Sequence, residues 1–292
     1  MKNLIYSISK LIGVKKSEIV SNLKKYRNQI VVIKYGGSAM INPKLSNSFI
    51  ADIDIIVRSG IHPVIIHGGG PQINDVLSKM NIKHKFHQGI RITDDKTFKI
   101  VEMVLSGSIN KNISLALSRR NINAVGISGC DSRLIIAKKY SVTENGKKID
   151  LGNVGRPIKL NNKFMLSLIK NHIVPIVAPI GFNSSGKKFN INADLMAGFI
   201  AHELKARRLL MLTDVQGVIN KNNSLISELK LNDVKKMISN GIIYGGMIPK
   251  VNTCIDSVKK GVRASVIIDG RVKNALTKEL FSHQGMGTLF RK

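Results

Sequence analysis

The chain has 292 residues, 43% of them hydrophobic, and carries 46 Lys and Arg against 18 Asp and Glu, a formal net charge of +28. This length predicts a globular protein with a full core, built as one large α/β domain or as two lobes. No apolar run approaches the roughly 18 residues of a membrane-spanning helix, so we expect no membrane association. Two cysteines, neither in a zinc-like cluster, predict a reducing compartment and no metal site.

The positive charge is spread along the whole chain and forms neither a basic tail nor a long run of lysines. Aromatic residues make up only 5% of the chain, and no helix-turn-helix or RNA-recognition signature is present. We therefore expect no dedicated nucleic-acid function. Lys2 and Lys10 interrupt the apolar N-terminus and no small-residue cleavage site follows, so we expect a cytoplasmic protein and not a secreted one.

Short apolar runs alternate with amphipathic stretches along the chain. Residues 17–29 predict a first helix, with Ser17 as its N-cap. Further helices are predicted around 46–58, 71–80, 95–120, 163–171 and 193–204. Strands are predicted around 31–35, 63–67, 123–128, 133–139, 173–180, 209–213 and 266–268. A turn is predicted at 144–147. This alternation predicts a mainly parallel sheet covered by helices on both faces, with two lobes sharing the sheet.

Two of the predicted strands end in glycine-rich turns. The first strand runs through Lys34 into Gly36 and Gly37, and the second runs into the glycines at 68–70. Glycine lets the backbone turn and approach a ligand closely, and its exposed N–H groups suit anionic oxygens. One such turn is also typical of an ordinary strand end. Two in one parallel sheet would face each other across a crevice at the carboxyl ends of the strands.

Residues 181–188 nearly match the phosphate-binding P-loop. That motif needs Ser or Thr directly after its lysine to hold magnesium, and a helix that starts there. In this chain Lys188 stands at the hydroxyl position, and residues 189–192 alternate like a strand. The segment is therefore predicted to form a hairpin and not a P-loop.

Three polar side chains, Asn190, Asn192 and Asp194, alternate just before a predicted helix. In an extended backbone they would share one face, where they could position a substrate carboxylate and orient lysines. They could equally serve only to cap the helix. Both interpretations fit the spacing.

Two lysines lie beside glycine pairs. Lys34 precedes one pair, and Lys250 follows another at 245–246. Residues 212–218 add a strand end with polar residues and glycine, a candidate edge for a nucleotide. Such an arrangement suits transfer of a phosphoryl group, whose charge must be neutralised from both sides.

Five segments together resemble the branch of the amino acid kinase family that acts on N-acetyl-L-glutamate: residues 33–37, 67–71, 89–94, 190–194 and 245–250. The resemblance implies a three-layer αβα sandwich with a mostly parallel central sheet. It also implies an N-terminal helical arm at 1–29, a lobe for acetylglutamate binding and dimerisation at 30–182, and an ATP-binding lobe at 183–292. The implied reaction is ATP-dependent phosphorylation of the side-chain carboxylate of N-acetyl-L-glutamate, the second step of arginine synthesis from glutamate.

The same resemblance implies roles for individual residues. Lys34 matches a lysine that stabilises the transferring γ-phosphoryl oxygens, Lys250 one at the β–γ bridge, and Asp194 the carboxylate that holds both. Magnesium would arrive with ATP, because no protein cage for it is visible. The implied substrate contacts are Gly69, Gly70, Arg91, Asn190 and Asn192, and the implied ATP contacts are Gly36, Gly37, Thr213, Asp214, Gly217 and Val218.

The two ends of the chain resemble those of arginine-inhibited, hexamer-forming members of the family. The helix at 17–29 resembles their N-terminal extension, and residues 268–288 resemble their arginine pocket, with Glu279 and Gly287 as candidate effector contacts. Val266 departs from the pattern, because these members usually carry histidine there, and Cys130 replaces an expected lysine. Arginine inhibition is predicted. The sequence leaves three questions open: whether the protein is a dimer or a hexamer, whether it binds a PII-type signalling protein, and whether it belongs to the cytoplasm or to the plastid stroma.

Two other functions fit part of the sequence. A sister kinase could act on acetylaminoadipate, carbamate or aspartate, because one methylene in a pocket changes binding by only about 1–3 kcal/mol. A decayed kinase could serve as a binding module with its basic surface on nucleic acid. Retention of Lys34, Asp194 and Lys250 argues against decay.

Overall fold

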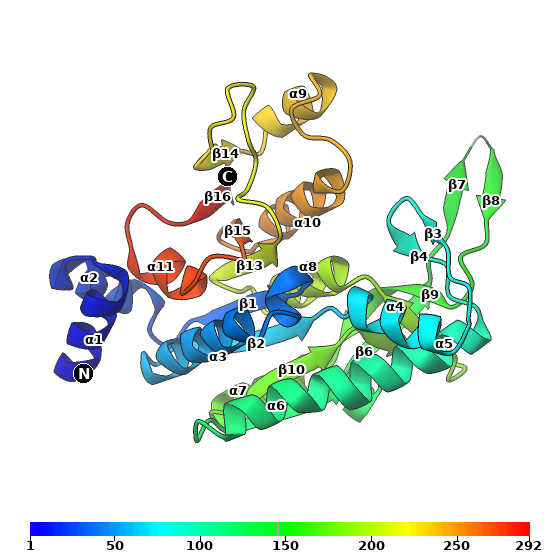
Figure 1. Ribbon diagram of the computed structural model, residues 1–292, viewed down its shortest axis with the longest axis horizontal. Coiled ribbons are helices and arrows are strands. Elements are labelled where there is room, and N and C mark those ends of the chain that lie inside the picture. The colour runs from blue at the N-terminus through cyan, green and yellow to red at the C-terminus, as the bar shows by residue number, and fades with distance from the viewer. Residues whose placement is uncertain (145) are drawn as a thin grey trace.

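The computed structural model describes residues 1–144 and 146–292 (Figure 1). Within them, an eight-stranded sheet forms the centre, and every neighbouring pair of its strands is parallel except β15 and β16. From edge to edge the strands are β14 (Glu228–Lys230), β16 (Gly287–Arg291), β15 (Ser265–Asp269), β13 (Arg208–Thr213), β1 (Ile30–Tyr35), β2 (His62–His67), β10 (Val174–Ala178) and β5 (Ala124–Ser128).

The central strands are buried on both faces, which explains why they read as continuous apolar runs and not as alternating ones. In β1, for example, Val31 and Ile33 face one helical layer while Val32 faces the other, and all three have no exposed surface. The predicted mostly parallel sheet is confirmed.

Helices cover both faces of the sheet (Figure 1). The first face is covered by α1 (Lys2–Ile12), α2 (Lys16–Tyr26), α3 (Pro43–Arg58), α4 (Gly70–Lys79), α5 (Asp95–Glu102), α6 (Asn110–Ser118) and α11 (Ala275–Phe281). The second is covered by α7 (Asn162–Lys170), α8 (Ala193–Glu203), α9 (Asp233–Ser239) and α10 (Met247–Lys259). The predicted αβα sandwich is therefore confirmed.

A second, small sheet closes into a barrel of β11 (Ile180–Phe182), β12 (Lys188–Ile191), β9 (Val154–Leu160) and β6 (Ile135–Lys139). Strands β11 and β12 are antiparallel, with Phe182 opposite Lys188, so the predicted hairpin at 181–188 is confirmed. The strand predicted at 173–180 was wrong in extent. Pro179 separates it into β10 and β11, which belong to different sheets.

Two short hairpins project side by side at one end of the molecule (Figure 1). One is formed by β3 (Phe86–His87) and β4 (Ile90–Arg91), the other by β7 (Val142–Glu144) and β8 (Lys147–Ile149). A side-chain amide of Gln88 donates to Glu144 at 3.3 Å and joins them. The turn predicted at 144–147 includes Asn145, which lies outside the described residues.

Two helical predictions need correction. Lys15 occupies the N-cap position of α2 and Ser17 lies inside its first turn, so the prediction of Ser17 as N-cap was wrong. The helix predicted at 95–120 is interrupted between α5 and α6 by a π-helical segment, η2 (Met103–Ile109). A π turn accommodates extra backbone without changing the apolar pattern enough to show in the sequence.

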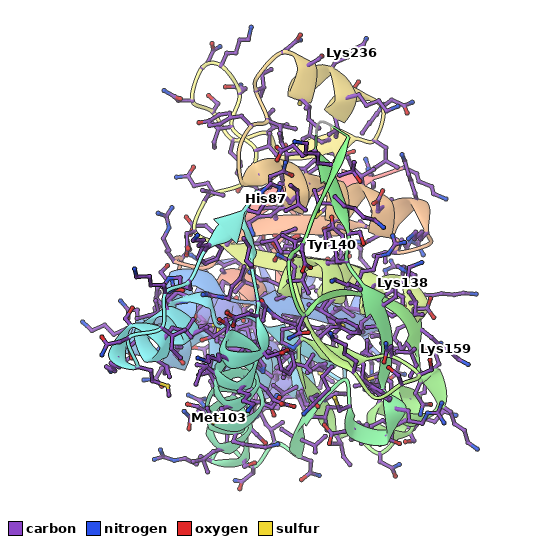
Figure 2. All side chains as sticks on the ribbon, turned by 90° about the vertical axis from the view of Figure 1, so that its right-hand side faces the viewer. His87, Met103, Lys138, Tyr140, Lys159 and Lys236 are labelled. Atoms are coloured by element: carbon purple, nitrogen blue, oxygen red, sulfur yellow. The ribbon has the colours of Figure 1, made fainter. Side chains whose placement is uncertain are left out.

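Exposed lysines lie on separate elements, such as Lys138 on β6, Lys159 on β9 and Lys236 on α9 (Figure 2). This placement agrees with the even spread of positive charge along the sequence. In the described part of the chain, no helix is long and apolar enough to cross a membrane.

Candidate active site

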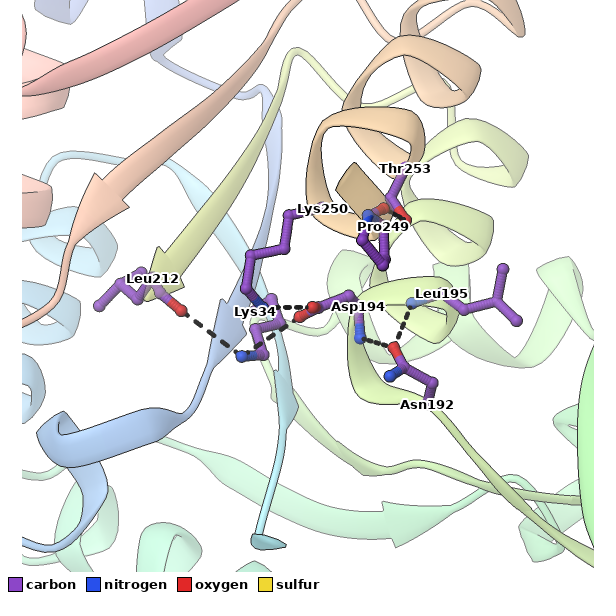
Figure 3. Close-up of polar contacts among 8 residues, drawn as sticks. All are labelled: Lys34, Asn192, Asp194, Leu195, Leu212, Pro249, Lys250 and Thr253. Carbon is purple, nitrogen blue, oxygen red and sulfur yellow. Dashed lines mark hydrogen bonds and ion pairs between the residues drawn. The ribbon is translucent and has the colours of Figure 1, made fainter. Parts of the chain in front are cut away.

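One carboxylate binds two ammonium groups at the carboxyl end of β1. Lys34 lies near the end of that strand, Asp194 in the first turn of α8, and Lys250 in the first turn of α10. The Nζ atom of Lys34 is 3.2 Å from Oδ1 of Asp194, and the Nζ atom of Lys250 is 2.6 Å from Oδ2 (Figure 3). Segments 56 and more residues apart therefore meet at Asp194.

The side chain of Asn192 caps the helix turn that carries this carboxylate. Its Oδ1 accepts hydrogen bonds from the backbone N–H groups of Asp194 at 2.9 Å and Leu195 at 3.1 Å, which caps α8 (Figure 3). The capping interpretation of the polar row is confirmed, and Asp194 also pairs with both lysines, while the positioning of a substrate carboxylate stays a prediction. Asn192 caps the helix, and the cap orients the turn from which Asp194 reaches the lysines.

The electrostatic balance at Asp194 favours its ionised form. Burial alone would raise the pKa of this carboxyl, but the nearby ammonium groups of Lys34 and Lys250 outweigh burial and lower the pKa to about 2. A carboxyl that stays ionised at neutral pH is a poor general base. What the structure shows for it is an ion pair with each of the two lysines.

A cavity of about 260 Å³ opens beside this triad. The glycine turns after β1 and β2, the β3–β4 hairpin and the strand leading into α8 all contribute to its wall. Of the predicted site residues it brings together Lys34, Gly36, Gly37, Gly69, Gly70, Arg91, Asn190, Asn192, Asp194 and Lys250. The crevice predicted between the two glycine-rich strand ends is thus present.

Arg91 lines this cavity and carries one buried donor without a partner among the described residues. Its Nη2 donates to Oδ1 of Asn74 at 2.7 Å and to the carbonyl of Gly70 at 3.2 Å, and its guanidinium lies 4.7 Å from the ring centre of Phe86. The buried Nη1 has no partner among the described residues. Because a buried donor without a partner is costly, Nη1 is suited to bind an acceptor on a ligand.

The glycine turn after β1 is held by Asp214, which directly follows the neighbouring strand β13. The Oδ1 atom of Asp214 accepts from the backbone N–H of Ser38 at 2.9 Å and from its hydroxyl at 2.6 Å. Gly37 has φ of +69°, and a Cβ there would lie 2.6 Å from Asp214. Asp214, predicted as an ATP contact, is therefore occupied in shaping the turn.

A second cavity, of about 660 Å³, lies along the edge that leads from β13 to α10. Thr213, Gly217 and Val218 line it, together with Tyr244. Lys250 borders both this cavity and the smaller one. The two cavities therefore share one lysine as a lining residue.

The candidate effector residues lie apart from both cavities. Glu279, in α11, accepts a hydrogen bond from the backbone N–H of Met286 at 2.7 Å, and burial raises the pKa of its carboxyl. Gly287, in β16, has no room for a side chain, because a Cβ would lie 1.9 Å from the carbonyl oxygen of Ile267. Val266 is fully buried in β15.

Three contributors to the site were given no role from the sequence: Ser38, Asn74 and Phe86. Ser38 directly follows the first glycine pair, where its hydroxyl is visible in the sequence. Asn74 and Phe86 act through Arg91, and nothing in their local pattern indicates that contact. Among the described residues, no group of three or more His, Cys, Asp or Glu side chains could hold a metal ion.

Comparison with known proteins identifies the family of this chain. The sequence pattern of the amino acid kinase family matches residues 29–269. The acetylglutamate kinase of Lawsonia intracellularis is 44% identical over 276 residues, 93% of either chain. That of Zymomonas mobilis is 45% identical over 279 residues, 94% of this chain and 93% of the relative.

Solved structures share the fold at lower identity. The N-acetylglutamate synthase of Neisseria gonorrhoeae complexed with coenzyme A and N-acetyl-glutamate has a TM-score of 0.84 at 21% identity over 94% of this chain, which spans 62% of the synthase chain. The carbamate kinase of Giardia lamblia bound to AMP-PNP has a TM-score of 0.63 at 19% identity, covering 90% of this chain and 98% of its own. On the family match and the near-full-length relatives, the chain belongs to the amino acid kinase family.

Proposed function

We propose that this protein transfers the γ-phosphoryl group of ATP to the side-chain carboxylate of N-acetyl-L-glutamate, a step of arginine biosynthesis. The observation that carries the proposal is the placement of Lys34 and Lys250 on opposite oxygens of Asp194, with Lys250 bordering both cavities. The names of the relatives at 43–45% identity support the choice of substrate.

The reaction needs charge neutralisation more than proton transfer. The attacking carboxylate is already a nucleophile, so no general base is required, which fits an Asp194 that stays ionised. Lys34 stabilises the oxygens of the transferring phosphoryl group, and Lys250 stabilises the leaving side. The N–H groups of Gly36 and Gly37 add donors at the phosphate.

The smaller cavity suits the acid substrate. The free Nη1 of Arg91 binds one of its carboxylates, and Asn190, whose side-chain amide donates to the hydroxyl of Thr93 at 3.2 Å, stands beside it. Gly69 and Gly70, which also line this cavity, contribute backbone donors.

The larger cavity suits ATP, which enters with its own Mg²⁺. Its wall comes from residues 213–250, whereas all but Lys250 of the smaller cavity's wall comes from residues 34–194. This difference supports an acid-binding lobe at 30–182 and an ATP-binding lobe at 183–292 after an arm at 1–29, with residues 190–194 of the second lobe also forming part of the smaller cavity's wall.

ADP release tests the substrate directly. Turnover is measured with N-acetyl-L-glutamate, acetylaminoadipate, carbamate and aspartate at matched concentrations. The highest kcat/KM is expected for N-acetyl-L-glutamate. A higher value for another acid would assign the chain to a sister kinase instead.

We further infer that arginine inhibits the enzyme through α11 and the N-terminal arm. Glu18 of α2 accepts a hydrogen bond from the backbone N–H of His283, so the arm lies against the segment that follows α11. Glu279 is available there as a partner for a guanidinium. Turnover at saturating arginine should fall in the wild type and be less affected in Glu279→Gln. Unchanged wild-type turnover would refute the inference.

The assembly belongs to the same proposal. The chain is proposed to form a homodimer or a hexamer, the second because the helix at 17–29 resembles the N-terminal extension of hexamer-forming members of the family. Light scattering of the wild type and of a chain lacking residues 1–29 distinguishes the two. If the wild type and the shortened chain form assemblies with the same number of subunits, the arm does not build a hexamer.

A further inference from the structure

A fully buried histidine lies directly beneath the second glycine turn. His67 ends β2, and its Nδ1 is 2.9 Å from the carbonyl oxygen of Gly68. A carbonyl can only accept, so Nδ1 must carry a proton. Nε2 lies 3.1 Å from the side-chain nitrogen of Asn110, which can only donate. These two contacts define one neutral tautomer, in agreement with burial lowering the pKa of His67 to about 4.

Asn110 is itself fixed from several sides. Its side-chain nitrogen also donates to the carbonyl of Ile176 in β10 at 2.9 Å. Space for its side chain depends on Gly126 in β5, where a Cβ would lie 2.1 Å from Oδ1 of Asn110. The residue therefore cannot rotate away from the histidine without leaving a buried group unpaired.

The histidine determines how one peptide group points. The N–H of Gly68 donates to the carbonyl of Tyr35 at 2.7 Å, and the carbonyl of Gly68 accepts from His67, so both polar groups of Gly68 are fixed. In a trans peptide the C=O and the following N–H point in opposite directions. The N–H of Gly69 is therefore directed away from the His67 ring.

Gly69 lines the smaller cavity, on whose wall Lys34 and Gly36 also lie. No backbone or side-chain acceptor for its N–H occurs in the described part of the protein. The π-helical segment η2 closes the other side of the turn, since a Cβ on Gly69 would lie 2.5 Å from Ile109 and 2.7 Å from Leu105. The turn is thus held by His67 on one side and packed by η2 on the other.

We propose that His67, oriented by Asn110, is a positioning residue that aims the N–H of Gly69 at the oxygens of the reacting carboxylate or phosphoryl group. The identity of the reaction rests on the proposed function, but the orientation of the peptide does not. His67 touches no ligand and exchanges no proton. Its effect passes through the Gly68–Gly69 peptide group.

Two substitutions separate the hydrogen bond from the packing. In His67→Asn, the side-chain amide occupies the place of Nδ1 and can still donate to Gly68. In His67→Gln, the amide lies at the place of Nε2, where it can pair with Asn110 but leaves the carbonyl of Gly68 without a donor. Both variants are polar and smaller than or similar to histidine, so their melting temperatures provide the common control for stability.

The expected result is a split between the two variants. His67→Gln should lower kcat about tenfold or more, a fraction of the loss seen when a preorganised donor is removed outright, while KM for ATP stays within about threefold. His67→Asn should retain most of the wild-type kcat. Crystal structures should show the Gly68–Gly69 peptide rotated in the Gln variant and unchanged in the Asn variant.

Equal kcat in the two variants, or an unrotated peptide in His67→Gln, would overturn the proposal. A wild-type protein that fails to turn over N-acetyl-L-glutamate would instead contradict the proposed function. In that case the peptide orientation in the two crystal structures still decides the role of His67.

Discussion

The ammonium group of Lys250 lies 2.6 Å from Oδ2 of Asp194, and the other oxygen of that carboxylate faces Lys34. One side chain therefore bridges the two charges to which the proposed phosphoryl transfer assigns its stabilisation. Lys34→Ala or Lys250→Ala should each lower kcat about a hundredfold or more, the scale of losing a preorganised donor. Asp194→Ala should lower kcat to a similar extent, while its circular dichroism spectrum shows that the fold is intact. Near-normal turnover in either lysine variant would disprove its role, and the exposed Lys79→Ala is the control.

Asp214 should act through the turn that it holds. Asp214→Ala removes the acceptor for both the N–H and the hydroxyl of Ser38. Hydrogen bonds to charged groups contribute about 1.5–3 kcal/mol, so kcat/KM for ATP should fall about tenfold or more. Asp214→Asn keeps an acceptor oxygen and should give an intermediate value. Steady-state kinetics with equal results for wild type and the Ala variant would contradict this role.

The close packing of Gly69 predicts a steric effect. A methyl group there would meet side chains of η2 at 2.5–2.7 Å, so Gly69→Ala must displace the turn or the helix. We expect KM for the acid substrate to rise about tenfold, by loss of about 1.4 kcal/mol of binding. Gly107→Ala is a matched control, because a Cβ at Gly107 of the same segment has no atom within 4 Å. Similar KM values for the two variants would count against the steric argument.

Asp52 predicts how stability depends on pH. Burial raises the pKa of this carboxyl in α3 to about 7, against the effect of hydrogen bonds from Thr277 and Leu276. Ionisation of Asp52 therefore opposes folding. The contribution of the protonated carboxyl to the free energy of unfolding is fully present below the ordinary pKa of 3.8 and is lost as the pH rises to about 7.

Asp52→Asn cannot ionise but can still pair with both partners. Its free energy of unfolding relative to wild type should rise by on the order of 2 kcal/mol between about pH 5 and pH 8. Urea denaturation at both pH values measures the difference, with the exposed Asp75→Asn as control. A pH-independent difference would show that Asp52 does not titrate in this range.

Local sequence patterns were enough to predict the strands and glycine turns at the site. Strand β1 and the turn at Gly36 and Gly37 follow from a β-branched run that ends in residues free to adopt positive φ. Lys34 is placed by that strand alone. Asp194 and Lys250 also stood out by their local patterns, and the resemblance to a family then joined them to Lys34 across the length of the chain.

Long-range contacts were the part that sequence reasoning did not reach. The bond from Ser38 to Asp214 joins residues 176 apart, and the bond from Arg91 to Asn74 joins two elements whose packing no local pattern describes. The misplaced N-cap at Ser17 has a similar origin. Ser17 is a good cap by type, but α2 begins earlier because Lys15 already has the extended backbone of a cap residue.

The π-helical segment has a consequence for chimeras and deletions. Such a segment absorbs one extra residue locally, while the α-helical turns on either side keep their faces toward the core. Removing one residue between Met103 and Ile109 should therefore close the bulge into regular α-helix and leave Asn110 between β5 and β10. A second deletion would have no bulge to absorb it and would rotate α6 relative to α5 by about 100°. A graft from a homologue with a regular helix should therefore tolerate the loss of one residue here, but not of two.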